Sequence, residues 1–184
     1  AEIKAELASF YLRQNPPQRE LGEKVAKEAL VIDPDNVEAN RALGFLYSNV
    51  VDTDSRNMSV SMAEALKNAI LHLEKAQAGA EGVDLNVLYR LGVLYTSAGQ
   101  PEKAVAALTR VASQNPANPQ VRLALAGSHA AAGDLQSAIG TLEEVVEFLP
   151  NVANDLGRYQ QSAGLFREAA ATYTIALAVR PNDR

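Results

Sequence analysis

The stretch LGVLYTSAGQPEKAVAALTRVASQNP, residues 91–116, decides the fold. Leu91, Leu94 and Tyr95 recur at three- and four-residue steps, the spacing of one apolar face of an α-helix. Gly99 follows where such a helix ends with a positive φ, and Pro101 stands in the first turn of the next helix. The stretch therefore predicts two helices joined by a tight glycine turn, with helix A over residues 84–98, and a closing proline.

The same pattern of glycine, alanine and proline recurs along the chain. Gly99, Ala104 and Pro116 reappear 34 residues later as Gly133, Ala138 and Pro150, and 31 residues further as Gly164, Ala169 and Pro181. A fixed period of this size is typical of a stack of identical helix-turn-helix units. We therefore expect one all-α solenoid over residues 1–184, with repeats at about 1–35, 36–83, 84–117, 118–149 and 150–184.

Composition narrows the classes of function. The net charge is −5 and the lysines and arginines are scattered among acidic residues, which disfavours nucleic-acid binding. There is no cysteine, and no apolar run approaches the ~18 residues of a membrane span. The start without methionine suggests a segment of a longer protein, and the composition, rich in alanine, glutamine and valine and free of cysteine, suggests a bacterial one. We expect a soluble chain without membrane insertion, and cytoplasm and periplasm both remain open.

The pattern resembles the tetratricopeptide repeat family. Its helix A signature stands here as Leu43-Gly44-x-x-Tyr47 and Leu91-Gly92-x-x-Tyr95, and its turn glycine and helix B alanine as Gly99 and Ala104. The sequence departs from the family pattern at single packing positions. For example, His129 and Gln160 stand where the family pattern has tyrosine. The resemblance implies a right-handed superhelical solenoid of about five repeats in which the helices A line a concave groove.

The resemblance also implies which side chains face that groove. The positions that the family uses for carboxylate binding hold Ala5 with Ser9, and Tyr89 with Val93, so a carboxylate clamp is not expected. Amides, hydroxyls and single aromatics suit a peptide segment or helix of a partner instead. Carried over residue by residue, the groove comprises Arg13, Glu38, Arg41, Phe45, Asn49, Asn86, Tyr89, Val93, Thr96, Gln120, Leu123, Asn154, Arg158 and Gln161. We expect Arg41, Tyr89 and Arg158 to be the main anchors.

An inserted loop is predicted over residues 50–61, within the second repeat. Ser61 and Glu64 form a capping box for the helix that follows. The acidic residues at 52 and 54 lack the further ligands of a calcium loop. The apolar side chains Met58, Val60 and Met62 either fold back over neighbouring repeats or meet a partner.

The sequence indicates no catalytic or metal site and no cofactor. His72 and His129 lie in different repeats without metal-ligand or nucleophile spacing, and His129 is expected to be a core residue. We therefore predict a non-catalytic protein-interaction scaffold. The alternatives are a self-associating or structural arm of a larger protein, with a homodimer through the last helix, or the regulatory arm of an enzyme.

Overall fold

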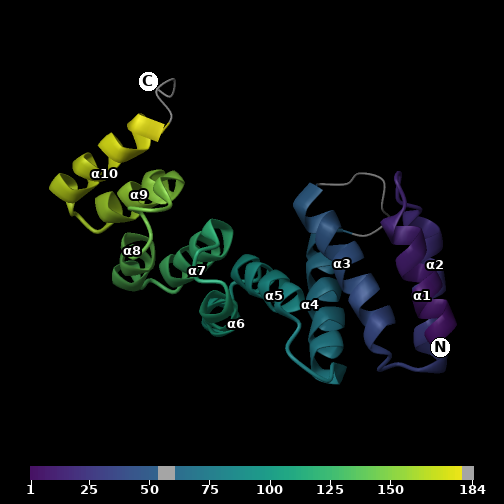
Figure 1. Cartoon of the computed structure of the whole chain (residues 1–184). Helices are drawn as coiled ribbons and strands as arrows, with labels where there is room; N and C mark the ends of the chain where they lie inside the picture. Colours follow the sequence, from purple (N-terminus) through teal and green to yellow (C-terminus); the bar gives the residue numbers. More distant parts are fainter. Residues whose placement is uncertain (54–60, 180–184) are drawn as a thin grey trace. The chain divides into compact units, whose positions relative to one another are not determined.

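The computed structural model describes residues 1–53 and 61–179, and its regular structure in those ranges is helical. Two compact units divide the chain, Ala1–Leu94 and Tyr95–Arg184, and the division falls within the fifth helix. The helices are α1 (Glu2–Arg13), α2 (Arg19–Ile32), α3 (Val37–Thr53), α4 (Met62–Gly79), α5 (Leu85–Ser97), α6 (Pro101–Gln114), α7 (Pro119–Ala131), α8 (Leu135–Glu143), α9 (Ala153–Ser162) and α10 (Phe166–Val179), with the 3₁₀ turn η1 at Pro150–Val152 (Figure 1).

The predicted glycine turns are present. Gly99, Gly133 and Gly164 have φ angles of 68°, 81° and 78°, a region that residues with a Cβ rarely adopt. Pro101 occupies the first turn of α6, where its missing N–H removes no helical hydrogen bond. The two helices and the glycine turn predicted from residues 91–116 are therefore present in the structure.

In the first unit, α3 packs against α4, α1 and α2. Small side chains such as Ala26, Ala39 and Ala69 are fully buried, which lets the helix axes approach closely. Polar contacts tie the same helices together: Ser9 of α1 donates to Glu38 of α3 over 2.5 Å. Helix α3 therefore lies between α4 on one side and the pair α1 and α2 on the other (Figure 1).

In the second unit, each helix packs against the next, from α6 through α10. One apolar cluster joins α7, α8 and α9, with Ile139, Leu142, Val145 and Leu156 at its centre. Leu156 is buried, as are Leu91 and Leu125 at the same position of the two preceding repeats. The three residues that this repeat lacks are absent from the connection before α9, where η1 leads directly into the helix.

A close approach explains the glycine of the helix A signature. A Cβ on Gly44 would lie 2.5 Å from the side chain of Leu73, and one on Gly157 would lie 2.7 Å from the ring of Tyr173. Leu73 and Tyr173 occupy the same place in their helices B. The glycine therefore makes room for a large side chain of the facing helix.

Two boundaries differ from the sequence-based expectation. The predicted loop at 50–61 is wrong at its start, because α3 continues to Thr53, and residues 54–60 lie outside the described part. Met62 begins α4 and is exposed. The second helix of the fourth repeat ends well before its closing Pro150, because α8 stops at Glu143 and Glu144 and Glu147 follow it. The closing Pro181 lies outside the described residues.

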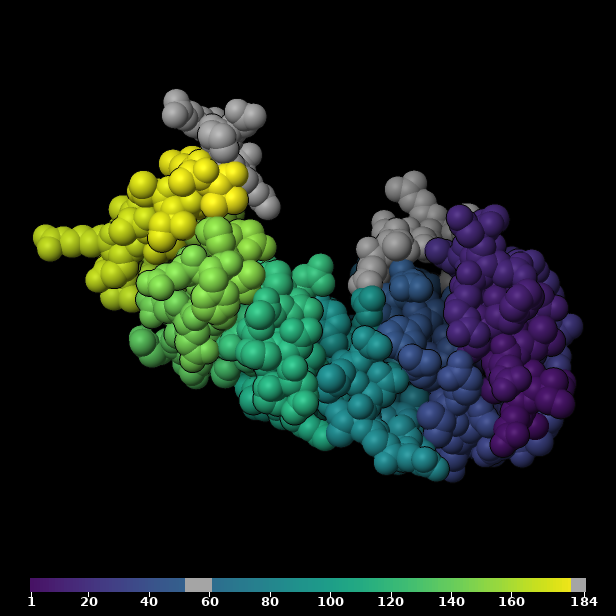
Figure 2. All heavy atoms as spheres, viewed as in Figure 1, coloured from purple at the N-terminus to yellow at the C-terminus, as the bar shows by residue number. Residues whose placement is uncertain are grey.

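The last helix presents an apolar face. Phe166 and Leu177, on one side of α10, are 69% and 45% exposed, and Ile175 is exposed on the opposite side. In Figure 2, α10 (yellow) adjoins α9 (light green) at the edge of the second unit.

Candidate functional site

A concavity of about 330 Å³ lies in the first unit between α1, the start of α2 and α3. It contains every predicted groove residue of the first two repeats, so helices α1 and α3 bring these side chains together. Its lining is Ser9, Leu12, Arg13, Pro17, Arg19, Glu38, Arg41, Ala42, Phe45, Leu46 and Asn49.

Arg41 is held at the centre of this site by two carboxylates. Its Nε lies 3.1 Å from Asp84 Oδ2, and its Nη1 lies 3.6 Å from Glu38 Oε2. The guanidinium carbon also lies 5.7 Å from the centre of the Phe45 ring, in a cation–π arrangement. The predicted anchor therefore lines the concavity with its charge opposed by two carboxylates, although its Nε has no hydrogen-bond partner among the described residues.

Glu38 is likewise engaged. Its Oε1 accepts the hydrogen bond from Ser9, and its Oε2 faces Arg41. Two further arginines line the same concavity, Arg13 in the last turn of α1 and Arg19 at the start of α2. The site therefore carries three guanidinium groups against one carboxylate in its lining, although the chain as a whole is acidic.

The predicted groove residues of α5 do not line this concavity. Asn86 is exposed, and Tyr89 and Val93 are half-buried. The start of α5 is fixed by Asp84, whose Oδ1 accepts from the backbone N–H groups of Asn86 and Val87 over 2.9 and 3.2 Å. Asp84 thus caps α5 and holds Arg41 with its other oxygen.

In the second unit, the predicted residues lie on three helices. Thr96 Oγ1 is 2.8 Å from Ser128 Oγ, which joins α5 to α7. Arg158 is exposed, pairs with Asp155 over 2.6 Å and lies 5.1 Å from the centre of the Tyr159 ring. Gln120, Asn154 and Gln161 are exposed, and Leu123 is half-buried.

Asn154 borders a separate concavity of about 240 Å³ at the end of the second unit. The rest of its lining comes from the η1 turn and from the last two turns of α10, including Tyr173 and Leu177. The Tyr173 hydroxyl donates to Gln161 Oε1 over 3.2 Å. This hollow lies against the exposed apolar face of α10.

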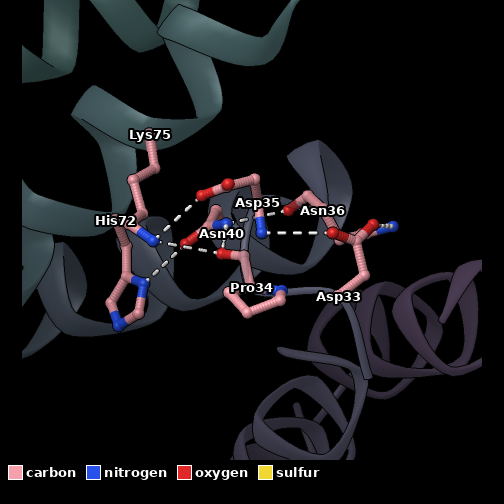
Figure 3. Close-up of polar contacts among 7 residues, drawn as sticks. All are labelled: Asp33, Pro34, Asp35, Asn36, Asn40, His72 and Lys75. Atoms are coloured by element: carbon pink, nitrogen blue, oxygen red, sulfur yellow. Dashed lines mark hydrogen bonds and ion pairs between the residues drawn. The ribbon is translucent and has the colours of Figure 1, made fainter. Parts of the chain in front are cut away.

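A buried polar network in the first unit was not predicted from the sequence (Figure 3). Asn40 is fully buried, and its Nδ2 donates to the carbonyl oxygens of Pro34 and Asn36 over 3.1 and 3.0 Å. Its Oδ1 lies 2.9 Å from His72 Nδ1, so this imidazole nitrogen is the donor. Lys75 Nζ donates to the same Pro34 carbonyl over 3.2 Å. The network joins α4 to the turn before α3.

The environment of His72 favours its neutral form. Burial lowers the pKa of this imidazole below the usual value of 6.5, and the ammonium groups of Lys75 and Lys27 lower it further. The ring stacks on Tyr47, with centroids 5.9 Å apart. Burial raises the pKa of the Tyr47 phenol, whose hydroxyl donates to Glu23 over 2.9 Å. His72 therefore acts as a structural link between helices.

The other side chains that were considered for a chemical role lie apart from this network. His129 is half-buried in the last turn of α7, so the expectation of a core residue is only partly met. Gln160, the other departure, is buried and accepts from Thr172 over 2.8 Å. Among residues 1–53 and 61–179, no three His, Asp or Glu side chains are grouped as metal ligands. No helix in those ranges is both long and apolar enough to cross a membrane.

Comparison with known proteins agrees with this architecture. Residues 95–161 match a family model described as tetratricopeptide repeat. The resemblance to the tetratricopeptide repeat family is confirmed. Searching curated protein sequences finds none that matches significantly.

Solved tetratricopeptide repeat structures share the fold. One, "Crystal structure of MamA protein", has a TM-score of 0.77 at 19% identity, covering 97% of this chain and 92% of the other. Another, "Crystal structure of YrrB: a TPR protein with an unusual peptide-binding site", has a TM-score of 0.79 at 20% identity, covering 98% and 86%. The predicted all-α tetratricopeptide repeat solenoid is thereby confirmed.

Proposed function

We propose that this chain is a protein-interaction scaffold whose helices A bind a peptide segment or helix of a partner. Tetratricopeptide repeat chains are generally non-catalytic interaction modules, and we infer the same role here. The observation that carries the proposal is the concavity between α1 and α3, where all five predicted groove residues of the first two repeats converge. The structurally similar YrrB is described as having a peptide-binding site, which supports the same interpretation.

The groove assignment is extended to both units as part of this proposal. In the first unit it comprises the concavity and the α5 residues Asn86, Tyr89 and Val93. In the second unit it comprises the exposed residues Gln120, Asn154, Arg158 and Gln161 together with Thr96 and Leu123. We retain the five repeats at 1–35, 36–83, 84–117, 118–149 and 150–184 as the proposed domain organisation.

A displayed peptide library selected against the immobilised chain tests the proposal. An enriched peptide is then titrated into isotopically labelled protein, and the perturbed backbone amides are mapped. We expect perturbations on α1, α3, α5, α7 or α9, whereas the outer faces of α2 and α6 stay unchanged. If no peptide is enriched, or if the perturbations fall on α2 and α6 alone, the groove proposal is wrong.

Self-association is a second candidate function, favoured by the exposed apolar face of α1. Leu7 is 40% exposed, although Leu43, Leu91, Leu125 and Leu156, at the same position of later repeats, are buried. Ile3 and Phe10, on the same face of α1, are 83% and 55% exposed. In later repeats, the corresponding apolar face of helix A packs against the preceding helix B. Helix α10 is a helix B whose apolar side chains are exposed.

A second copy of the chain would let α10 of one molecule cover α1 of the next, a head-to-tail contact that makes chains or rings. We expect the sedimentation coefficient to rise with concentration, and the double variant Ile3→Asp/Phe10→Asp to abolish that rise. A single monomeric boundary at every concentration would remove this candidate and leave the groove proposal intact.

A further inference from the structure

We propose that the concavity between α1 and α3 selects a peptide segment that carries one apolar side chain with an acidic residue on one side and a basic residue on the other. The inference rests on the proposed peptide-binding function and adds the chemistry of the ligand. Three features of the first unit support it: the floor of the concavity, the charges of its lining and the surface beside it.

The floor fits one apolar side chain. Ala42 and Leu46 are buried in the core and form a fixed base, with Leu12 and Pro17 beside them. Phe45 is half-buried, and Arg41 holds its ring from one side. Because these side chains are already packed, a leucine or phenylalanine of the ligand would bury apolar surface without a large rearrangement.

The charges of the lining favour an acidic residue beside that apolar group. Arg41 is balanced by Glu38 and Asp84, and the Glu38 carboxylate is occupied by Arg41 and Ser9. Arg13 is exposed and, among the described residues, has no ion-pair or hydrogen-bond partner for its side chain. A ligand carboxylate is therefore the group that best satisfies this guanidinium.

The neighbouring surface has the opposite charge. A shallow concavity of about 650 Å³ shares Arg13 and Glu38 with the first, and it runs along the start of α1 and the turn before α3. Its other ionisable side chains are all acidic, namely Glu2, Glu6, Asp33 and Asp35, and of these Asp35 is paired with Lys75 over 3.1 Å. A ligand that is acidic throughout would be repelled there, whereas a basic residue on that side is attracted. The two surfaces together require opposite charges on the two flanks of the apolar side chain.

Short synthetic peptides, acetylated and amidated so that their termini are uncharged, test this pattern by fluorescence anisotropy with the whole chain. Each peptide has a central leucine, and the flanks are acidic on one side and basic on the other, in both sequence orders. The comparison peptides have acidic flanks only, basic flanks only or serine flanks. We expect one of the two dipolar orders to bind tightest, and replacement of its leucine by serine to weaken binding about tenfold or more.

Arg13→Gln is the matching variant of the protein, because Arg13 has no structural partner to lose among the described residues. It should weaken the dipolar peptide roughly two- to fivefold, as expected for an exposed ion pair, and leave the serine-flanked peptide unchanged. Arg110→Gln, on the exposed surface of α6, is the control and should change neither. Raising the salt concentration should reduce the advantage of the dipolar peptide.

The outcomes separate this inference from the proposed function. Peptides that bind with no preference among flanks, or equally well to the Arg13→Gln variant, would overturn the ligand pattern while peptide binding itself stood. Binding that is strongest for the wholly acidic peptide would overturn the role of the acidic surface. Failure of every leucine peptide in the set would also overturn the inference, and the library selection would still decide the proposed function separately.

Discussion

Single glycines have opposite roles within the fourth repeat. Gly133 has a φ of 81°, so a Cβ there strains the backbone although no neighbouring atom is near. Gly140 lies inside α8, where a Cβ would also meet nothing within 4 Å. We expect Gly133→Ala to lower the free energy of unfolding by ~1 kcal/mol, and Gly140→Ala to raise it by ~0.5–1 kcal/mol. Urea denaturation of both variants checks this, and the same sign for both would contradict the turn.

His72 makes stability depend on pH. Its folded-state pKa is lowered from 6.5, so the unfolded chain takes up the proton more readily than the folded chain does. Its contribution is complete above about pH 7 and is lost as the pH falls below 6.5. We expect the free energy of unfolding to decrease over that range by at most ~1.4 kcal/mol per pH unit.

Denaturation series between neutral and mildly acidic pH, with His72→Gln as the comparison, measure this dependence. Glutamine has no proton to gain there, so its curve should be flatter than that of the parent chain. Parallel curves for the two proteins would show that the imidazole of His72 does not cause the loss of stability at acidic pH.

At the scale of helices, the repeats differ in how their ends are capped. Asn118 caps α7, and its side chain accepts from the backbone N–H groups of Gln120 and Val121. Gln100 is the N-cap of α6 and makes no side-chain hydrogen bond, because its longer side chain does not reach the first turn favourably. We expect Gln100→Asn to raise the free energy of unfolding by ~0.5–1 kcal/mol and Asn118→Gln to lower it. Thermal melting tests the pair, and a Gln100→Asn variant that melts lower would contradict the argument.

The sequence predicts the helices and turns well because their causes are local. Gly99 and Pro101 define the end of α5 and the start of α6 by backbone geometry alone. Five predicted groove residues, separated in the sequence, also lie together in one concavity. Where the local signal is weak the prediction fails, as at Thr53, since nothing before that residue breaks the helix.

Contacts across helices are not specified by the sequence pattern in the same way. Asn40 and His72 are 32 residues apart, and neither belongs to the repeat signature. The sequence predicts Arg41 as a groove anchor but not its ion pair with Asp84, which stands at the start of a different repeat. Such partners depend on the side-chain directions in the packed helices, which a repeat pattern does not specify. Substitution of Arg13 is therefore a better test of ligand binding than substitution of Arg41.

At the scale of the whole chain, the two compact units should respond separately to local damage. A repeat stack gains its stability from neighbouring contacts, so loss of packing in one place is felt most strongly nearby. Leu142 is fully buried in the cluster that joins α7, α8 and α9. Leu142→Ala should cost ~2–5 kcal/mol of local stability.

Hydrogen exchange followed by mass spectrometry distinguishes local from global loss. We expect the Leu142→Ala variant to exchange faster in α7, α8 and α9, whereas amides of α1, α3 and α4 keep the protection that they have in the parent chain. The reciprocal variant Leu73→Ala, in the buried core of the first unit, should reverse the pattern. If both substitutions instead lowered protection equally throughout, the chain would unfold as one cooperative solenoid. Ligand binding at α1 and α3 would then also stabilise the second unit, whereas independent units confine that stabilisation to the first.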